Sequence, residues 1–83
     1  MYIGALILLP DGSRKIVESE GYLAIPKFTF AIGEHAKAEN KLVKMVCDDV
    51  RALSMLSKSL DGVKVEFGIK GTLEIELNEK QET

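Results

Sequence analysis

The stretch from Gly33 to Leu60 constrains the fold most, because its apolar residues recur at the spacing of an amphipathic helix. No glycine or proline occurs between residues 34 and 60, and Gly62 is well placed to end a helix. The pattern predicts one long helix that lies on a sheet. It begins at Gly33 or, in a shorter version, takes Asn40 as its N-cap. The apolar side of this predicted helix consists of Leu42, Val43, Val46, Val50, Leu53, Leu56 and Leu60.

Asp49 projects into the middle of this apolar side. An unpaired carboxylate buried there would cost several kcal/mol, so the side chain must be paired, protonated or close to solvent. One interpretation is a structural residue at the rim of the core. The other is the acid of a site that binds a small molecule or a cation.

Strand patterns are found on both sides of the predicted helix. Residues 2–9 form an apolar run, and Pro10-Asp11-Gly12 is a typical turn before a second run at residues 14–19. A three-residue loop sets the register of this hairpin. The predicted pairs are Ile7 with Lys15, Leu6 with Ile16 and Ala5 with Val17.

Three further segments alternate between apolar and polar residues, as strands do. We expect residues 27–32 to form a strand directly before the helix, and residues 63–69 and 73–77 to form a second hairpin after it. In that hairpin Glu66 and Glu74 would lie opposite each other.

These elements define an α+β fold with a five-stranded, mainly antiparallel sheet packed on one long helix. The order along the chain is strand, strand, strand, helix, strand, strand. Residues 1–78 form a single domain in this interpretation, and residues 79–83 form a polar C-terminal tail.

Composition narrows the class of protein. The chain has 83 residues and a net charge of −2, which argues against a general electrostatic affinity for nucleic acid. No run is long and apolar enough to span a membrane, and residues 1–9 lack the basic flank of a signal peptide. Cys47 is the single cysteine, so no internal disulfide can form. We expect a cytoplasmic protein.

Enzyme signatures are missing from the sequence. It contains no phosphate-binding glycine loop, no HExxH motif, no paired CxxC and no nucleophile elbow. The single histidine, His35, and Cys47 lie about 18 Å apart along the predicted helix, too far to act together. We therefore expect a protein that is not an enzyme and that uses neither a cofactor nor a metal ion.

The leading functional hypothesis is an interaction or assembly module that works as a homo-oligomer, most simply a dimer. A single helix can cover only one face of the first hairpin, and the other face is also apolar. A second copy of the chain would cover it in a symmetric interface, unless residues 22–25 fold across it. The predicted interface consists of Tyr2, Leu6, Leu8 and Ile16.

Two alternatives use other parts of the predicted helix. A basic side opposite the apolar one would bind nucleic acid or an acidic partner. A site around Asp49 would bind a small molecule or a cation. The basic side consists of Lys37, Lys41, Lys44, Arg51 and Lys58.

Overall fold

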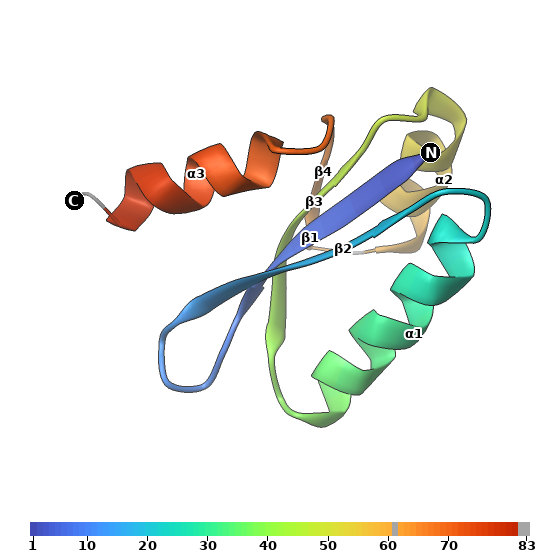
Figure 1. Cartoon of the computed structure of the whole chain (residues 1–83). Helices are drawn as coiled ribbons and strands as arrows, with labels where there is room; N and C mark the ends of the chain where they lie inside the picture. The colour runs from blue at the N-terminus through green and yellow to red at the C-terminus, as the bar shows by residue number, and fades with distance from the viewer. Residues whose placement is uncertain (61, 82–83) are drawn as a thin grey trace.

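The structure is a computed structural model that describes residues 1–60 and 62–81. Along these residues the elements follow the order β1, β2, α1, β3, α2, β4, α3 (Figure 1). The strands are β1 (Tyr2–Leu8), β2 (Arg14–Glu20), β3 (Lys41–Cys47) and β4 (Lys64–Phe67). The helices are α1 (Ala24–Lys37), α2 (Val50–Ser59) and α3 (Thr72–Gln81).

The strands form one mixed sheet of four strands in the order β2-β1-β3-β4. β1 pairs antiparallel with both β2 and β3, whereas β3 and β4 run parallel. Figure 1 shows α1 and α2 on one side of the sheet and α3 on the other. The fold is α+β, but the predicted five-stranded, mainly antiparallel sheet on one long helix is wrong.

The long helix predicted from Gly33 to Leu60 is not formed. α1 ends at Lys37, Glu39 takes a left-handed conformation with φ 65°, and the chain then enters β3. β3 lies between β1 and β4 and packs apolar side chains on both faces of the sheet, so its sequence is a dense apolar run. Such a run also satisfies a helical wheel, so periodicity alone cannot separate the two structures.

The strand predicted at residues 27–32 is part of α1. The buried Phe28 and the partly buried Ile32 lie four residues apart, on the side of α1 that faces the sheet. Pro26 lies in the first turn of the helix, where its missing N–H leaves no helical hydrogen bond unmade. Phe30, which the alternating pattern placed on the same side as Phe28, is instead 71% exposed.

The second predicted hairpin is also absent. β4 forms, but residues 73–77 belong to α3, where Leu73 and Leu77 lie four residues apart and pack against the sheet. Ile75 is 62% exposed, although a strand of period two would place it on the same face as Leu73 and Leu77. Apolar residues at i, i+2 and i+4 fit the pattern of a strand and, in part, that of a helix. The packing of Leu73 and Leu77 against the sheet favours the helix.

Two smaller expectations change with this helix. Glu66 lies on β4 and Glu74 on α3, so they do not form the predicted cross-strand pair. α3 continues to Gln81, so residues 79–81 of the predicted tail are helical. Residues 82 and 83, the end of that tail, lie outside the described residues.

The first hairpin is confirmed. Its register is the predicted one, with Leu6 opposite Ile16. The N–H of Leu9 donates to the carbonyl oxygen of Ser13 at 2.9 Å and closes the turn. Gly12 has a φ of 90°, a conformation that glycine adopts without strain.

The chain covers both faces of its own sheet. α3 lies over the second apolar face of the first hairpin, which sequence analysis left for a partner. The core under α1 and α2 includes Ile3, Ala5, Ile7, Phe28, Met45 and Cys47. The core under α3 consists of Tyr2, Leu6, Val46 and Leu73, with Ile16 and Leu77 at its rim.

Among the residues described, every helix is too short or too polar to cross a lipid bilayer.

Candidate functional site

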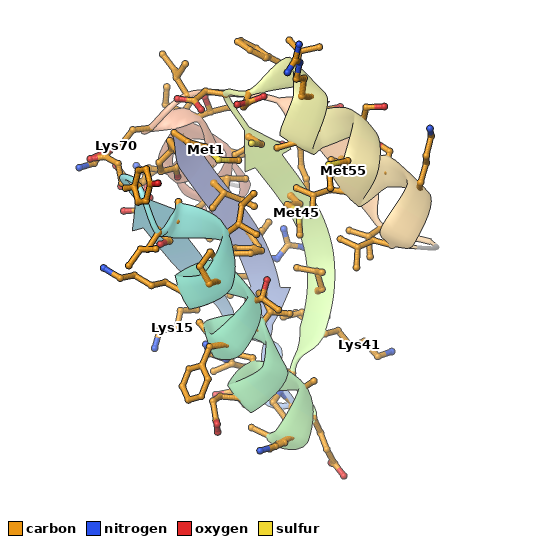
Figure 2. The ribbon with its side chains drawn as sticks, turned by 90° about the vertical axis from the view of Figure 1, so that its right-hand side faces the viewer. Met1, Lys15, Lys41, Met45, Met55 and Lys70 are labelled. Carbon is orange, nitrogen blue, oxygen red and sulfur yellow. The ribbon has the colours of Figure 1, made fainter. Side chains whose placement is uncertain are left out.

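α1 and α2 lie on the same face of the sheet but do not close over it. α1 packs mainly on β2 and β1, whereas α2 packs on β4 and β3. A groove is left between the two helices, and Figure 2 shows Met45 of the central strand β3 between them. We call this feature the α1/α2 groove.

Two adjoining hollows make up the α1/α2 groove. The larger, of about 290 Å³, opens between Ile25 of α1 and Met55 of α2. The smaller, of about 100 Å³, lies between Ile32 of α1 and Leu60. Leu56 lines both hollows, so they follow one another along α2. Together they approach the size of a small-molecule site, but they are open along their length as a cleft for an extended partner would be.

The walls of the groove follow from the spacing of residues on each helix. On α1, Ile25, Thr29 and Ile32 lie on the flank next to α2. On α2, Met55 is 67% exposed beside the partly buried Leu56. Both helices therefore turn apolar side chains toward the gap between them, and apolar surface left open in this way is typical of a binding site.

Asp49 has a structural role at one end of the groove. It is the N-cap of α2, and its Oδ1 accepts hydrogen bonds from the backbone N–H groups of Arg51 at 2.9 Å and Ala52 at 3.2 Å. The cap explains why an acid interrupts the apolar pattern at this position. Binding of a small molecule or a cation at Asp49 stays a prediction. Residues 1–60 and 62–81 contain no group of three side chains suited to hold a metal ion.

The basic side predicted for the long helix is not formed, because that helix is not formed. Its five residues lie on three elements: Lys37 on α1, Lys41 and Lys44 on β3, Arg51 and Lys58 on α2. Arg51 lines the α1/α2 groove, and Lys58 follows two helical turns later on the same side of α2. Lys41 begins β3 directly before Leu42, which lines the smaller hollow.

Lys44 lies on the opposite face of the sheet, where it is held by two carboxylates. Its side chain is 14% exposed, and Nζ lies 2.7 Å from Glu76 Oε2 and 2.9 Å from Glu66 Oε2. Partial burial would by itself lower the pKa of Lys44, but the hydrogen bonds and charges of Glu76 and Glu66 outweigh it and raise that pKa. Hydrogen bonds from Lys44 and Lys64 lower the pKa of Glu66 in turn. This cluster ties α3 to β3 and β4.

The predicted interface residues lie on the face that α3 covers. Tyr2 and Leu6 are buried, whereas Leu8 and Ile16 are partly buried. Residues 22–25, the alternative cover, lead into α1 on the other face instead. The dimer remains a prediction, but the open apolar face that motivated it is closed at Tyr2 and Leu6.

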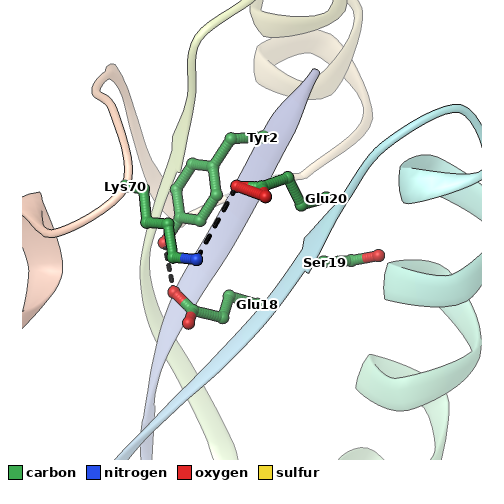
Figure 3. A pocket seen from close by; sticks show the side chains of 5 residues that line it. All are labelled: Tyr2, Glu18, Ser19, Glu20 and Lys70. Atoms are coloured by element: carbon green, nitrogen blue, oxygen red, sulfur yellow. Dashed lines mark hydrogen bonds and ion pairs between the residues drawn. The ribbon is translucent and has the colours of Figure 1, made fainter.

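A separate polar hollow of about 190 Å³ lies at the start of β1 (Figure 3). Tyr2 Oη donates a hydrogen bond to Glu18 Oε2 at 2.7 Å, and Lys70 Nζ lies 3.9 Å from Glu20 Oε2. Burial, followed by the hydrogen bond to Glu18 and the nearby negative charges, raises the pKa of Tyr2 well above its ordinary value. A phenol that stays protonated is neither a base nor a nucleophile at neutral pH.

Cys47 and His35 are not placed as catalytic groups. Cys47 is buried on β3, and burial raises the pKa of its thiol, which makes the thiol a poor nucleophile. His35 lies near the end of α1, with its Nδ1 2.8 Å from Asn40 Nδ2. Both side chains have local structural explanations.

No protein-family model, curated protein or solved structure matches the chain. The candidate site is therefore defined by its geometry. Ile25 and Met55 were not predicted to line a site, because the predicted long helix does not contain Ile25 and has different bounds around Met55. The available signal was the spacing of Ile25 from Phe28 and Ile32, which is helical.

Proposed function

We propose that the chain is a non-enzymatic interaction module that binds an acidic amphipathic helix of another protein in the α1/α2 groove. The observation that carries this proposal is the open apolar floor and walls of the groove beside basic side chains on α2. A groove between two helices suits a third helix, whose apolar residues at i, i+3, i+4 and i+7 form a single stripe.

The two hollows support a helical partner over a compact ligand. They lie in a row along α2 and share Leu56, so successive apolar side chains of one helix can enter one after the other. Met45 and Leu42 provide an apolar floor beneath the smaller hollow. Burying the partner's stripe there removes apolar surface from water on both sides, which is the main source of affinity in such grooves.

Charge supports an acidic partner. Arg51 lines the larger hollow, and Lys58 is exposed two helical turns later on the same side of α2. Asp49, the acid at the groove, is already occupied by two backbone N–H groups. Acidic residues beside the partner's apolar stripe would therefore meet cations, which speeds association and fixes orientation.

The test uses a fluorescein-labelled synthetic peptide with leucine at i, i+3, i+4 and i+7 and glutamate elsewhere, followed by fluorescence anisotropy. A peptide of the same composition with its leucines scattered around the helix is the ligand control. We expect saturable, salt-sensitive binding of the first peptide, about tenfold weaker for Met55→Glu, because a carboxylate is then forced into the apolar hollow.

Ser54→Glu is the matched control, since Ser54 is exposed on the same helix and does not line the groove. The double variant Arg51→Glu, Lys58→Glu should weaken binding and reduce its salt dependence. Equal affinity for both peptides, or equal losses for Met55→Glu and Ser54→Glu, would contradict the proposal. Displacement of the peptide by a duplex oligonucleotide would favour the nucleic-acid alternative instead.

A further inference from the structure

β2 is an edge strand of the sheet, and half of its backbone groups face outward. The carbonyl oxygen of Ser13 accepts a hydrogen bond from β1, and the N–H of Gly21 donates one to Met1, at the two ends of the hairpin. In an antiparallel pair the bonded residues alternate, so the odd-numbered residues between them also bond to β1. The residues whose N–H and C=O groups point to the free edge are therefore Arg14, Ile16, Glu18 and Glu20.

The charges along this edge are ordered. β2 begins with Arg14 and Lys15 and ends with Glu18 and Glu20, with Ile16 and Val17 between them. A second β2 strand that runs antiparallel places the basic beginning of one strand against the acidic end of the other. Charged residues on an edge strand commonly discourage pairing with unrelated strands, but this order makes β2 complementary to itself.

One register uses the full length of both strands. When Val17 lies opposite Val17 of a second copy, Arg14 lies opposite Glu20 and Ile16 opposite Glu18. All four are outward-bonding positions, so about eight backbone hydrogen bonds can form across the pair. A shift that centres the pair on Glu18 would place two carboxylates face to face and is disfavoured.

α1 presents a matching surface above this edge. Its groove flank carries Ile25 and Thr29, so the opposite flank, above the free edge of β2, carries Lys27, Phe30 and Glu34. Phe30, which is 71% exposed, is the apolar residue of this flank. In an antiparallel pair of α1 helices, Lys27 of one copy would face Glu34 of the other across the two phenylalanines.

The strand and the helix share one symmetry point. Val17 lies about 13 Å before Gly21 along β2, at about 3.3 Å per residue. α1 starts beside Gly21, where Ala24 N–H bonds its carbonyl oxygen, and runs back along β2. About nine helical residues cover 13 Å. The part of α1 level with Val17 therefore lies within one turn of the midpoint between Lys27 and Glu34. α1 packs on both β2 and β1. With each α1 axis above the space between these two strands, a strand spacing of about 4.8 Å places the two axes roughly 10 Å apart, a normal packing distance.

We propose that two copies of the chain form a symmetric dimer in which the β2 strands pair antiparallel and the Lys27–Phe30–Glu34 flanks of the two α1 helices pack together. The dimer joins the two sheets into one. The α1/α2 grooves lie on the other flanks of α1 and stay open, so the dimer presents two of them.

Charge exchange between separate chains tests the pairing. Arg14→Glu places two carboxylates at each of the two equivalent pairs, and Glu20→Arg places two cations there. Each variant alone should dissociate at a concentration at least about tenfold higher than the unmodified chain, measured by sedimentation velocity. Mixing the two variants restores both pairs, so native mass spectrometry should show a heterodimer in preference to either homodimer.

Two further measurements keep the test independent of folding defects. Phe30→Glu should weaken the dimer, whereas Phe67→Glu, which changes another exposed phenylalanine, on β4, should not. Hydrogen exchange of the Ile16 and Glu18 amides should slow as the protein concentration rises. A monomer at all micromolar concentrations overturns the proposal, and so does a mixture of the two variants that forms no heterodimer. Rescue of Arg14→Glu by Glu18→Arg in place of Glu20→Arg would overturn the stated register.

Discussion

Lys44 Nζ on β3 lies 2.7 Å from Glu76 Oε2 on α3, a contact between residues 32 positions apart. α3 meets the sheet through few apolar side chains, chiefly Leu73 and Leu77, so a partly buried ion pair near its centre helps to fix where the helix lies. Without this helix, the second apolar face of the hairpin would be open.

Replacement of Lys44 tests this role. Lys44→Ala should reduce the free energy of unfolding by about 2 kcal/mol, because it leaves Glu76 and Glu66 close together without their shared cation. Lys64→Ala, at an exposed lysine 3.0 Å from Glu66, should cost about 0.5 kcal/mol or less. Urea denaturation measures both, and equal losses would contradict a special role for Lys44.

Gly4 has no room for a side chain. A Cβ there would lie 2.6 Å from Tyr2 Oη and 3.2 Å from Leu73 Cδ1. We expect Gly4→Ala to destabilise the fold by about 1–3 kcal/mol, and by less in a Tyr2→Phe background that lacks the closest atom. Gly33→Ala is the control, since nothing lies within 4 Å of its added Cβ, and it should be neutral or slightly stabilising. Additive effects of the Gly4 and Tyr2 changes would count against the close contact.

Asp49 caps α2 through two backbone N–H groups. Asp49→Ala should cost about 1 kcal/mol of stability, whereas Asp49→Asn should cost little, because asparagine caps helices equally well. Thermal unfolding followed by circular dichroism compares the two. If Asp49 also bound a ligand through its charge, Asp49→Asn would lose that binding although it keeps its stability.

The raised pKa of Tyr2 predicts a loss of stability in alkali. In the folded chain the phenol keeps its proton at pH values where the unfolded chain has released it. The stabilisation is therefore complete below pH 10.0 and declines as the pH rises above that value. Tyr2→Phe should show a shallower decline in the urea midpoint over the same range. Curves that stay parallel for the two proteins would show that another group titrates, and Lys44, whose pKa is also raised, would be the next to test.

Local sequence patterns predicted part of the fold correctly. The first hairpin, its turn and its register depend on residues close in sequence, so Pro10-Asp11-Gly12 and the flanking alternation were sufficient. Two other sequence features were recognised but misinterpreted. Asn40 was taken as a possible N-cap of the long helix, and Asp49 as an acid that interrupts its apolar side. Both mark real boundaries, since Asn40 directly precedes β3 and Asp49 is the N-cap of α2.

The candidate site depends on contacts that no local pattern contains. The α1/α2 groove exists because α1 lies on β2 and β1 while α2 lies on β4 and β3, and that arrangement follows from the strand order. Ile25 and Met55 are far apart in sequence, and each alone is an unremarkable apolar residue. Their meeting across one hollow could not be derived without the sheet between them.

The sequence by itself determined the β1–β2 hairpin, its two apolar faces and the ordered charges of β2, because turn chemistry and alternation act between neighbours. The tertiary structure alone decided that residues 41–47 form a central strand and that residues 72–81 form a helix. Both segments have apolar patterns that fit helix and strand alike. Pairing with β1 and burial against Tyr2 and Leu6 select between them, and those partners lie near the start of the chain.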